Sequence, residues 1–249
     1  MRELTRPEDA GGLLARLPSV PLGAVIVVAD EDVAVLVRGD AAVATLGPGR
    51  HELTAEALPA VAEAAFGDVL DAELWFVRSA PLFGVRVGGP AGQFLDPASG
   101  IYVRPRFTGE VAVAASDPAR LVAALTAGGL PDEGPALLAF VRTQVLEGVR
   151  RALTSICGAG AGTFAELDPL LAQLVEQLPL QLDLEDLGLS VGALSSAALT
   201  LTPEESAAVA ASRVVGAESR VRAIHCPRCG AQARGTYCTQ CGGPVNQAG

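Results

Sequence analysis

The sequence contains no lysine and little of the chemistry that enzymes commonly use. All 18 basic residues are arginine, and the 249 residues include only two histidines, His51 and His225. No Gly-x-Ser-x-Gly motif offers a nucleophilic serine, and the glycine-rich residues 158–162 lack the Lys-Ser/Thr pair of a phosphate-binding loop. We interpret residues 158–162 as a helix-helix linker and His51 as the partner of a local hydrogen bond. The sequence therefore predicts no catalytic residue and no enzymatic activity.

Long apolar runs are also absent. No stretch approaches the ~20 uninterrupted apolar residues that a membrane-spanning helix needs. The opening MRELTRPEDAGG lacks the basic-then-apolar progression of a signal peptide. We expect a cytoplasmic protein whose only membrane contact would be peripheral, at the inner face of the cell membrane.

Aromatic residues make up only 4% of the chain, but half of all residues are hydrophobic, which is typical of a folded globular protein. Continuous or alternating apolar runs predict strands, and apolar residues three and four apart predict helices. Their order predicts an α+β fold with a mixed or antiparallel sheet and packed helices. Strands are expected at residues 22–46, 72–77, 83–87, 102–106, 110–115 and 194–201, and helices at residues 119–127, 134–156, 164–178 and 202–223.

The N-terminal segment is expected to be an arm or a short helix. Pro7 marks a helix start, and Leu13, Leu14 and Leu17 would provide a small apolar face. That face would either dock on the body or insert peripherally into a membrane, and docking is the commoner outcome for so short a segment with few basic residues.

A strong helix signal begins at Thr202. Thr202 can cap the helix, Pro203 suits its first position, and Glu205 can complete a capping box. The heptad positions of this helix carry small side chains, which predict only a weak coiled coil. These positions are Ala207, Val214 and Val221.

Charge divides the chain into an acidic body and a basic tail. The net charge of −10 argues against broad nucleic-acid binding. Residues 1–212 carry 13 arginines against 27 acidic residues, whereas residues 213–249 carry five arginines against one acidic residue. The tail would meet either an acidic surface on a partner or its own acidic body, and both interpretations stay open.

The predicted segments are an arm at 1–21, a domain at 22–201, a connecting helix at 202–224, a zinc ribbon at 225–243 and a frayed end at 244–249.

Four cysteines in the tail form two Cys-x-x-Cys-Gly knuckles. Each knuckle directs two thiolates to one point, and its glycine permits a positive φ. The eight residues between the knuckles are too few and too polar to bury a core, so metal binding must supply a folding free energy on the order of 10 kcal/mol. We predict one structural Zn²⁺ held by Cys226, Cys229, Cys238 and Cys241.

Disulfides and a redox dithiol are the alternatives to zinc. A cytoplasmic location disfavours stable disulfides, and a redox motif normally opens a helix in a larger fold. His225 adjoins Cys226 but is not needed as a ligand, and Cys157 is expected to be a buried or inert thiol. Four protein ligands leave no open position for catalysis. The ribbon would therefore act through its surface, where Arg228 and Arg234 favour a protein partner over nucleic acid.

Three stretches of the body resemble a known family. They are GAVIVVADEDVAVLVRGDAAVATLGPGRHEL, DPASGIYVRPRFTGEVAVAASDPARLV and LEDLGLSVGALSSAALTLTPEE. The order of elements in these stretches resembles the SPFH domain of stomatins, prohibitins, flotillins and the HflK/HflC proteins. That order is strands, a Gly-Pro-Gly turn, a second sheet, paired helices, a closing strand and an outgoing helix. With the terminal zinc ribbon, the chain resembles a bacterial subgroup labelled virion-core-protein-like.

This resemblance implies a non-enzymatic scaffold that forms homo-oligomers and organises membrane stress responses or microdomains. A phage-shock-type membrane stress protein is the partner it implies. Many relatives have an N-terminal membrane hairpin and a long coiled coil, which this sequence does not show, so small oligomers or recruitment by a partner are expected. Two hypotheses from other classes stay open: a nucleic-acid-associated regulator that uses the ribbon, and a redox- or zinc-sensing module.

Overall fold

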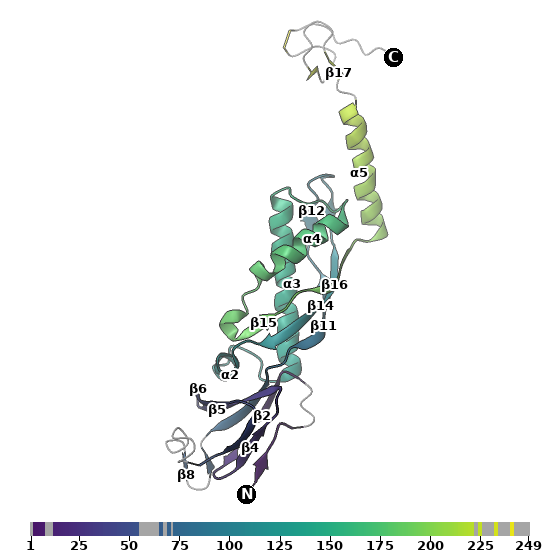
Figure 1. The fold of residues 1–249 in the computed structure, drawn as a ribbon. Coiled ribbons are helices and arrows are strands. Elements are labelled where there is room, and N and C mark those ends of the chain that lie inside the picture. The colour runs from purple at the N-terminus through teal and green to yellow at the C-terminus, as the bar shows by residue number, and fades with distance from the viewer. Residues whose placement is uncertain are drawn as a thin grey trace.

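The elements are arranged along one long axis, with the N-terminal strands at one end and helix α5 leaving the other (Figure 1). The computed structural model describes residues 2–7, 12–54, 65–66, 69–70, 72–221, 224–225, 232–233 and 240–241. Most strand pairs are antiparallel, and four helices of the described residues accompany them. The chain therefore has the α+β fold that the sequence predicts.

The strands of the N-terminal part are β1 (Glu3–Leu4), β2 (Leu14–Leu17), β3 (Val20–Pro21), β4 (Val25–Val28), β5 (Asp32–Arg38), β6 (Ala41–Leu46), β7 (Gly49–Glu52), β8 (Ala65–Phe66), β9 (Val69–Leu70) and β10 (Glu73–Arg78). The later strands are β11 (Leu82–Pro90), β12 (Phe94–Leu95), β13 (Tyr102–Val103), β14 (Arg106–Ala115), β15 (Leu189–Val191), β16 (Ser195–Thr200), β17 (Ile224–His225) and β18 (Gln232–Ala233). The helices are α2 (Pro118–Thr126), α3 (Gly134–Gly158), α4 (Leu167–Gln177) and α5 (Pro203–Val221), with 3₁₀ helices η1 (Leu178–Gln181) and η2 (Glu185–Leu187).

The central sheet of the N-terminal part, in the order β2-β10-β5-β6, separates two hydrophobic clusters. Ala34 and Leu36 of β5 pack in one cluster with Ile26 of the neighbouring β1-β4-β7 sheet. Val35 and Val37, which alternate with them, pack in the larger cluster with the helices. Strand β5 is therefore buried on both faces, which explains its continuous apolar sequence.

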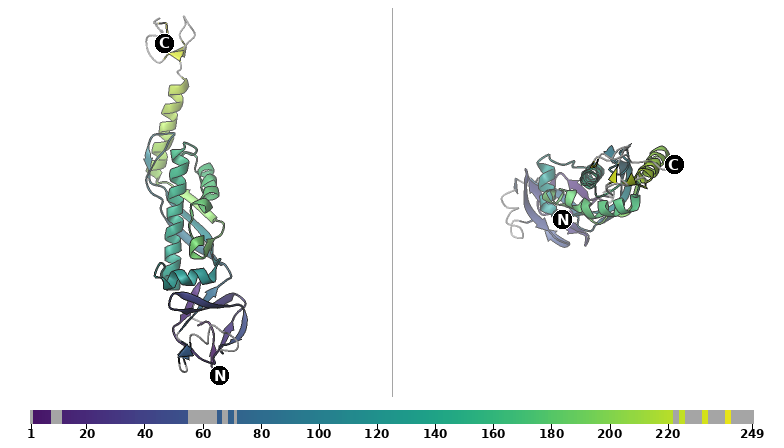
Figure 2. Two further views of the ribbon diagram at one scale, coloured as in Figure 1. Left: turned by 90° about the vertical axis from the view of Figure 1, so that its left-hand side faces the viewer. Right: turned by 90° about the horizontal axis from the view of Figure 1, so that it is seen from above.

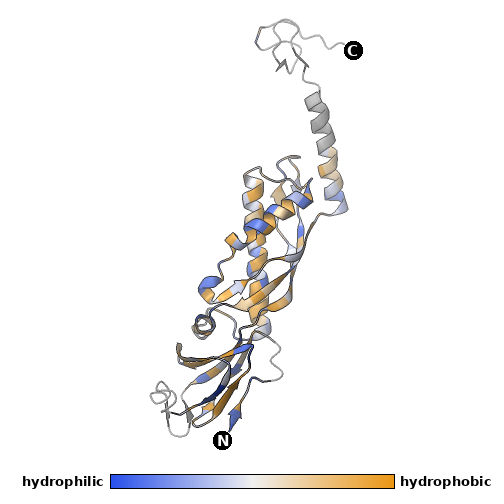
Figure 3. Cartoon of the chain, in the orientation of Figure 1, coloured by the Kyte–Doolittle hydropathy of each residue, from blue (hydrophilic) through white to orange (hydrophobic). Residues whose placement is uncertain are grey.

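Strand β14 organises the second half of the body. It pairs with β11 along one edge and with both β15 and β16 along the other. Its buried residues alternate, and they share one core with Val141, Val145 and Val149 of α3. Helix α3 runs lengthwise beside this sheet (Figure 2), and hydrophobic residues line both elements (Figure 3).

The junction between the start of α2 and the residue after η2 depends on a helix cap and on a glycine. Asp117 Oδ1 accepts a hydrogen bond from Arg120 N at 3.0 Å and caps the helix. Gly188 follows η2 with a φ of +73°, and a Cβ added there would lie 2.4 Å from Asp117 O. Only glycine fits this turn, because both its backbone conformation and its space exclude a side chain.

The N-terminal segment differs from the prediction of an arm or short helix at 1–21. Leu14–Leu17 is strand β2, which pairs antiparallel with β10 and sets Leu17 opposite Leu74. Leu13 and Leu14 are buried in the main core. Pairing with β10 satisfies the backbone and buries both leucines, and this tertiary gain outweighs a weak local helix signal.

Three smaller differences concern strands. Gly49–Glu52 forms β7 and pairs with β4, so a strand begins already at the last residue of the Gly-Pro-Gly turn. The strand predicted at residues 102–106 is divided between β13 and β14, and the three-residue strand β15 was not predicted.

The predicted helices correspond to α2, α3, α4 and α5. Within the described ranges, no helix combines the length and hydrophobicity needed to cross a bilayer.

Candidate functional site at the α5 junction

Two short strands flank the first Cys-x-x-Cys of the predicted metal site in the sequence. Strands β17 and β18 pair antiparallel, with Ile224 opposite Ala233 and His225 opposite Gln232, so the first Cys-x-x-Cys lies between two paired strands. Antiparallel pairing of the flanking strands is compatible with a zinc knuckle, in which two thiolates are brought together between two strands.

The cysteines themselves lie mostly outside the described residues. Cys226, Cys229 and Cys238 are not described, and Cys241 lies in an exposed turn. Their number and spacing fit a tetrahedral Zn²⁺ site, and zinc stays a prediction. In the described ranges, no group of three or more His, Cys, Asp or Glu residues is arranged to hold a metal ion.

The start of α5 carries the predicted capping box. Glu205 N donates to Thr202 Oγ1 at 3.2 Å, and Thr202 N donates to Glu205 Oε2 at 3.0 Å. Arg104 N, in the connection between β13 and β14, donates to Glu205 Oε1 at 2.8 Å. Desolvation opposes ionisation of Glu205, but these hydrogen bonds outweigh it and lower its pKa. Glu205 therefore anchors α5 to the body as well as capping it.

An acidic groove of about 610 Å³ lies where α5 passes the start of α4. Glu166 and Asp168 contribute exposed carboxylates to its lining, and Val209 contributes the apolar floor. Val209 is buried in the main core. The remaining lining residues are Phe164, Ala165, Leu167, Pro169, Ser206 and Ala210. The groove can accept a cationic segment that also has a small apolar surface.

Asp96 holds the wall of this groove in place. Its buried carboxylate accepts hydrogen bonds from Ser99 N at 2.8 Å, Ser99 Oγ at 2.6 Å, Thr163 Oγ1 at 2.7 Å and Phe164 N at 2.8 Å. The Phe164 ring lies 5.8 Å from the Phe94 ring, centroid to centroid. Burial alone would raise the pKa of Asp96, but the four hydrogen bonds lower it below the ordinary value. A carboxylate thus ties the β12–β13 hairpin to the α3–α4 linker.

Cys157 lies at the end of α3 and is half-buried. Burial, and then the nearby charge of Asp96, raise the pKa of this thiol to about 11. Because the thiolate is the reactive form, the thiol is inert near neutral pH, as the sequence predicts.

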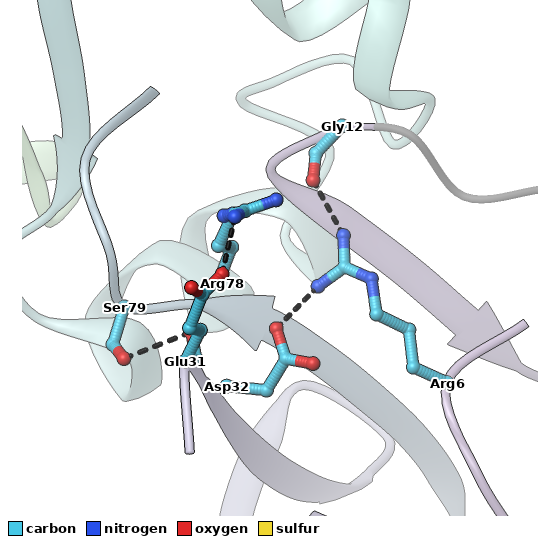
Figure 4. Close-up of polar contacts among 6 residues, drawn as sticks. All are labelled: Arg6, Gly12, Glu31, Asp32, Arg78 and Ser79. Carbon is cyan, nitrogen blue, oxygen red and sulfur yellow. Dashed lines mark hydrogen bonds and ion pairs between the residues drawn. The ribbon is translucent and has the colours of Figure 1, made fainter. Parts of the chain in front are cut away.

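A polar cluster at the opposite end of the body has a structural role (Figure 4). Arg6 contacts Asp32 at 2.7 Å and donates to Gly12 O at 2.5 Å. Arg78 pairs with Glu31, whose backbone oxygen accepts from Ser79. The opposite charges are paired within the cluster, which fastens the N-terminal segment to the sheet.

His51 and residues 158–162, which the sequence also singled out, do not line the groove and play local roles. His51 Nε2 lies 2.8 Å from Gly47 O, which is the local hydrogen bond expected for it. Residues 158–162 connect α3 to α4, as predicted for a linker. Sequence reasoning missed Asp96, Glu166 and Asp168, because no local pattern shows that Glu166 and Asp168 line a groove beside α5 or that Asp96 binds its wall at Phe164.

Comparison with known proteins adds no family: no protein-family model matches the chain, and no curated protein matches it.

Proposed function

We propose that this protein is a non-enzymatic, self-assembling scaffold built on an SPFH-like domain, with a zinc ribbon that docks a partner. The observation that carries the proposal is the path of α5. Its first turn is fixed to the body through Glu205 and Arg104, and its second half projects beyond the body (Figures 1 and 2). A fixed helix that leads away from a packed core is suited to presenting the C-terminal segment to another molecule.

Charge supports the same proposal. The basic residues 213–249 begin in the projecting half of α5, whereas the body of residues 1–212 is strongly acidic. A basic segment that begins on a helix leading away from the acidic body would be available to another molecule. This favours a partner surface over the body of the same chain. Peripheral attachment to the cell membrane and docking of a phage-shock-type stress protein rest on the resemblance alone.

Static light scattering after size-exclusion chromatography tests self-assembly. The full zinc-loaded chain is loaded over a range of concentrations, and its mass should rise with concentration from monomer to oligomer. A strict monomer at tens of micromolar would contradict the proposal.

A nucleic-acid-associated regulator is the second candidate, favoured by the five arginines against one acidic residue in residues 213–249. Such binding would be electrostatic and would weaken steeply with salt. Absence of a gel shift with DNA and RNA at low salt would remove this candidate, and a salt-sensitive shift would favour it.

A further inference from the structure

We propose that the open face of the β11-β14-β16 sheet docks an acidic helix of a partner protein. The docking surface consists of Arg86, Gly88, Arg104, Arg106, Thr108 and Ala198, and we call it the arginine face. None of these residues lines the acidic groove beside α5, and none belongs to the zinc ribbon. The inference goes beyond the proposed self-assembly and holds for a monomer as well as for an oligomer.

The alternation of residues along β13 and β14 creates this face. From residue 102 to residue 109, the even-numbered residues are exposed and the odd-numbered residues are buried. The buried residues Val103 and Phe107 belong to the core that includes α3. Successive side chains of a strand point to opposite faces of its sheet. The exposed residues, Arg104 and Arg106 among them, therefore lie on the face that is turned away from α3.

A row of small residues crosses the middle of the arginine face. Gly88 of β11 is paired with Thr108 of β14, and Thr108 is paired with Ala198 of β16. Neighbouring strands lie about 4.8 Å apart, so the row is about 10 Å wide. An α-helix with its side chains is about 10–12 Å across. The row is therefore wide enough for one helix, and its small side chains allow that helix to approach closely.

Arginines border this row on both sides. Arg106 precedes Thr108 by two residues on β14, and Arg86 precedes Gly88 by two residues on β11. Because the strands are antiparallel, the two arginines lie on opposite sides of the row, about 14 Å apart along the strands. Carboxylates on one docked helix can reach both.

The two arginines are available to an outside carboxylate. The side chain of Arg106 forms no hydrogen bond or ion pair with any residue that the structure describes. Arg86 pairs with Glu110 at 3.3 Å, but the Arg86 side chain is 87% exposed. Such an exposed pair contributes little and can exchange partners. Arg104 lies near Glu205 and helps to lower the pKa of that carboxyl, so Arg106 and Arg86 are the main contacts.

An exposed apolar pair adjoins the arginine face at one end. Leu95 and Tyr102 lie opposite each other on β12 and β13, and they are 49% and 64% exposed. Tyrosine and arginine are enriched among the residues that contribute most to protein interfaces. From Tyr102 to Glu110 the strand covers about 27 Å, the length of about 18 helical residues. The expected helix is therefore acidic, with an apolar residue near one end.

The edge of the sheet favours a helix over an added strand. Arg142 Nε donates to Arg86 O at 3.1 Å, and Arg150 Nη2 donates to Pro90 O at 3.0 Å. These side chains occupy carbonyls that an added strand would need on β11. A partner that docks on the face instead must satisfy its own backbone hydrogen bonds, as a helix does.

The charge of the body favours a short protein segment over a nucleic acid or a membrane. Residues 1–212 carry 13 arginines against 27 acidic residues. An extended anionic surface would meet these acidic residues as well as the arginine face and would be repelled. A single helix touches the arginine face alone.

Fluorescence anisotropy with a labelled peptide tests the inference on the full zinc-loaded chain. The probe is a helical peptide of about 18 residues, built from alanine and glutamate with a leucine near one end. Arg106→Gln and Arg86→Gln should each weaken binding about threefold, and R86Q/R106Q about tenfold, because each removes one exposed ion pair. Thr108→Tyr should weaken binding several-fold at unchanged charge, because its ring fills the row on which the helix lies.

Two matched controls remove one arginine elsewhere. Arg50→Gln on β7 and Arg234→Gln in the basic tail should leave the affinity for the peptide unchanged. The same peptide with lysine in place of glutamate should not bind. Urea unfolding of each variant should match that of wild type, because the substituted side chains are exposed.

Several results would overturn the proposal. These are a glutamate peptide that does not bind wild type, equal affinities of wild type and R86Q/R106Q, or an unchanged affinity of Thr108→Tyr, which would leave only non-specific attraction. A loss in Arg234→Gln as large as that in R86Q/R106Q would place the peptide on the tail. Duplex DNA or phosphatidylglycerol vesicles that bind wild type and not R86Q/R106Q would assign the face to a nucleic acid or a lipid surface. A monomeric wild type would contradict self-assembly and leave this inference standing.

Discussion

Replacement of Asp96 by asparagine should destabilise the body by about 2–3 kcal/mol at neutral pH. The substitution keeps the side-chain volume and removes the charge. Oδ1 accepts from Thr163 Oγ1 and Phe164 N, and an amide oxygen can retain both. Oδ2 accepts from Ser99 N and Ser99 Oγ, and an amide nitrogen there would face the Ser99 N–H as a second donor.

The magnitude follows from these contacts. One backbone hydrogen bond to a charged acceptor is lost, which is worth about 1.5–3 kcal/mol when the remaining donor stays buried. The two retained bonds lose their charge assistance and become weaker. Ser99 Oγ can turn to accept from the new amide, which recovers part of the loss.

The effect should depend on pH with a definite sign. The pKa of Asp96 in the folded state lies below its ordinary value of 3.8, so the carboxylate stabilises the fold fully above the unfolded-state pKa. This contribution is lost as the pH falls through the folded-state pKa. The difference between wild type and Asp96→Asn should therefore be constant between about pH 5 and pH 7 and should shrink below about pH 4.

Urea unfolding followed by circular dichroism measures the free energy of unfolding at each pH. Asp117→Asn is the matched control, because an exposed asparagine caps α2 as well as aspartate does and should change stability by less than about 0.5 kcal/mol. If Asp96→Asn behaved like this control, or if its effect persisted unchanged at pH 3, the role assigned to the buried carboxylate would be refuted.

Three further outcomes are expected. Elemental analysis should find one zinc per chain, and Cys238→Ser should lose the metal while the unfolding of the body stays unchanged; melting of the whole chain would contradict the division into body and ribbon. Glu205→Gln should cost about 1 kcal/mol of stability, because it removes a charged acceptor from Thr202 N and Arg104 N, and a thermal transition equal to that of wild type would argue against the anchor. With its thiol pKa at about 11, Cys157 should be alkylated at pH 8 at least about tenfold more slowly in the native than in the unfolded chain, as peptide mass spectrometry can show; equal rates would exclude an inert thiol.

Short-range signals predicted much of the secondary structure. The Thr202–Glu205 capping box is confirmed by reciprocal hydrogen bonds, and the spacing of apolar residues located α3. The apolar residues of β5 marked a strand, and the structure shows that this strand is buried on both faces. Each of these signals depends on residues within a few positions of one another, so it can be read without the fold.

The sequence by itself determined the α+β class, the start of α5, the charge division and the prediction of a four-cysteine zinc site. Only the tertiary structure decided that Leu14–Leu17 is a strand, because its pairing with β10 comes from residues far along the chain. Only the tertiary structure brings Asp96 to Thr163 and Phe164, and Asp168 to the side of α5. These arrangements depend on which distant segments share a buried contact, and no local pattern carries that information.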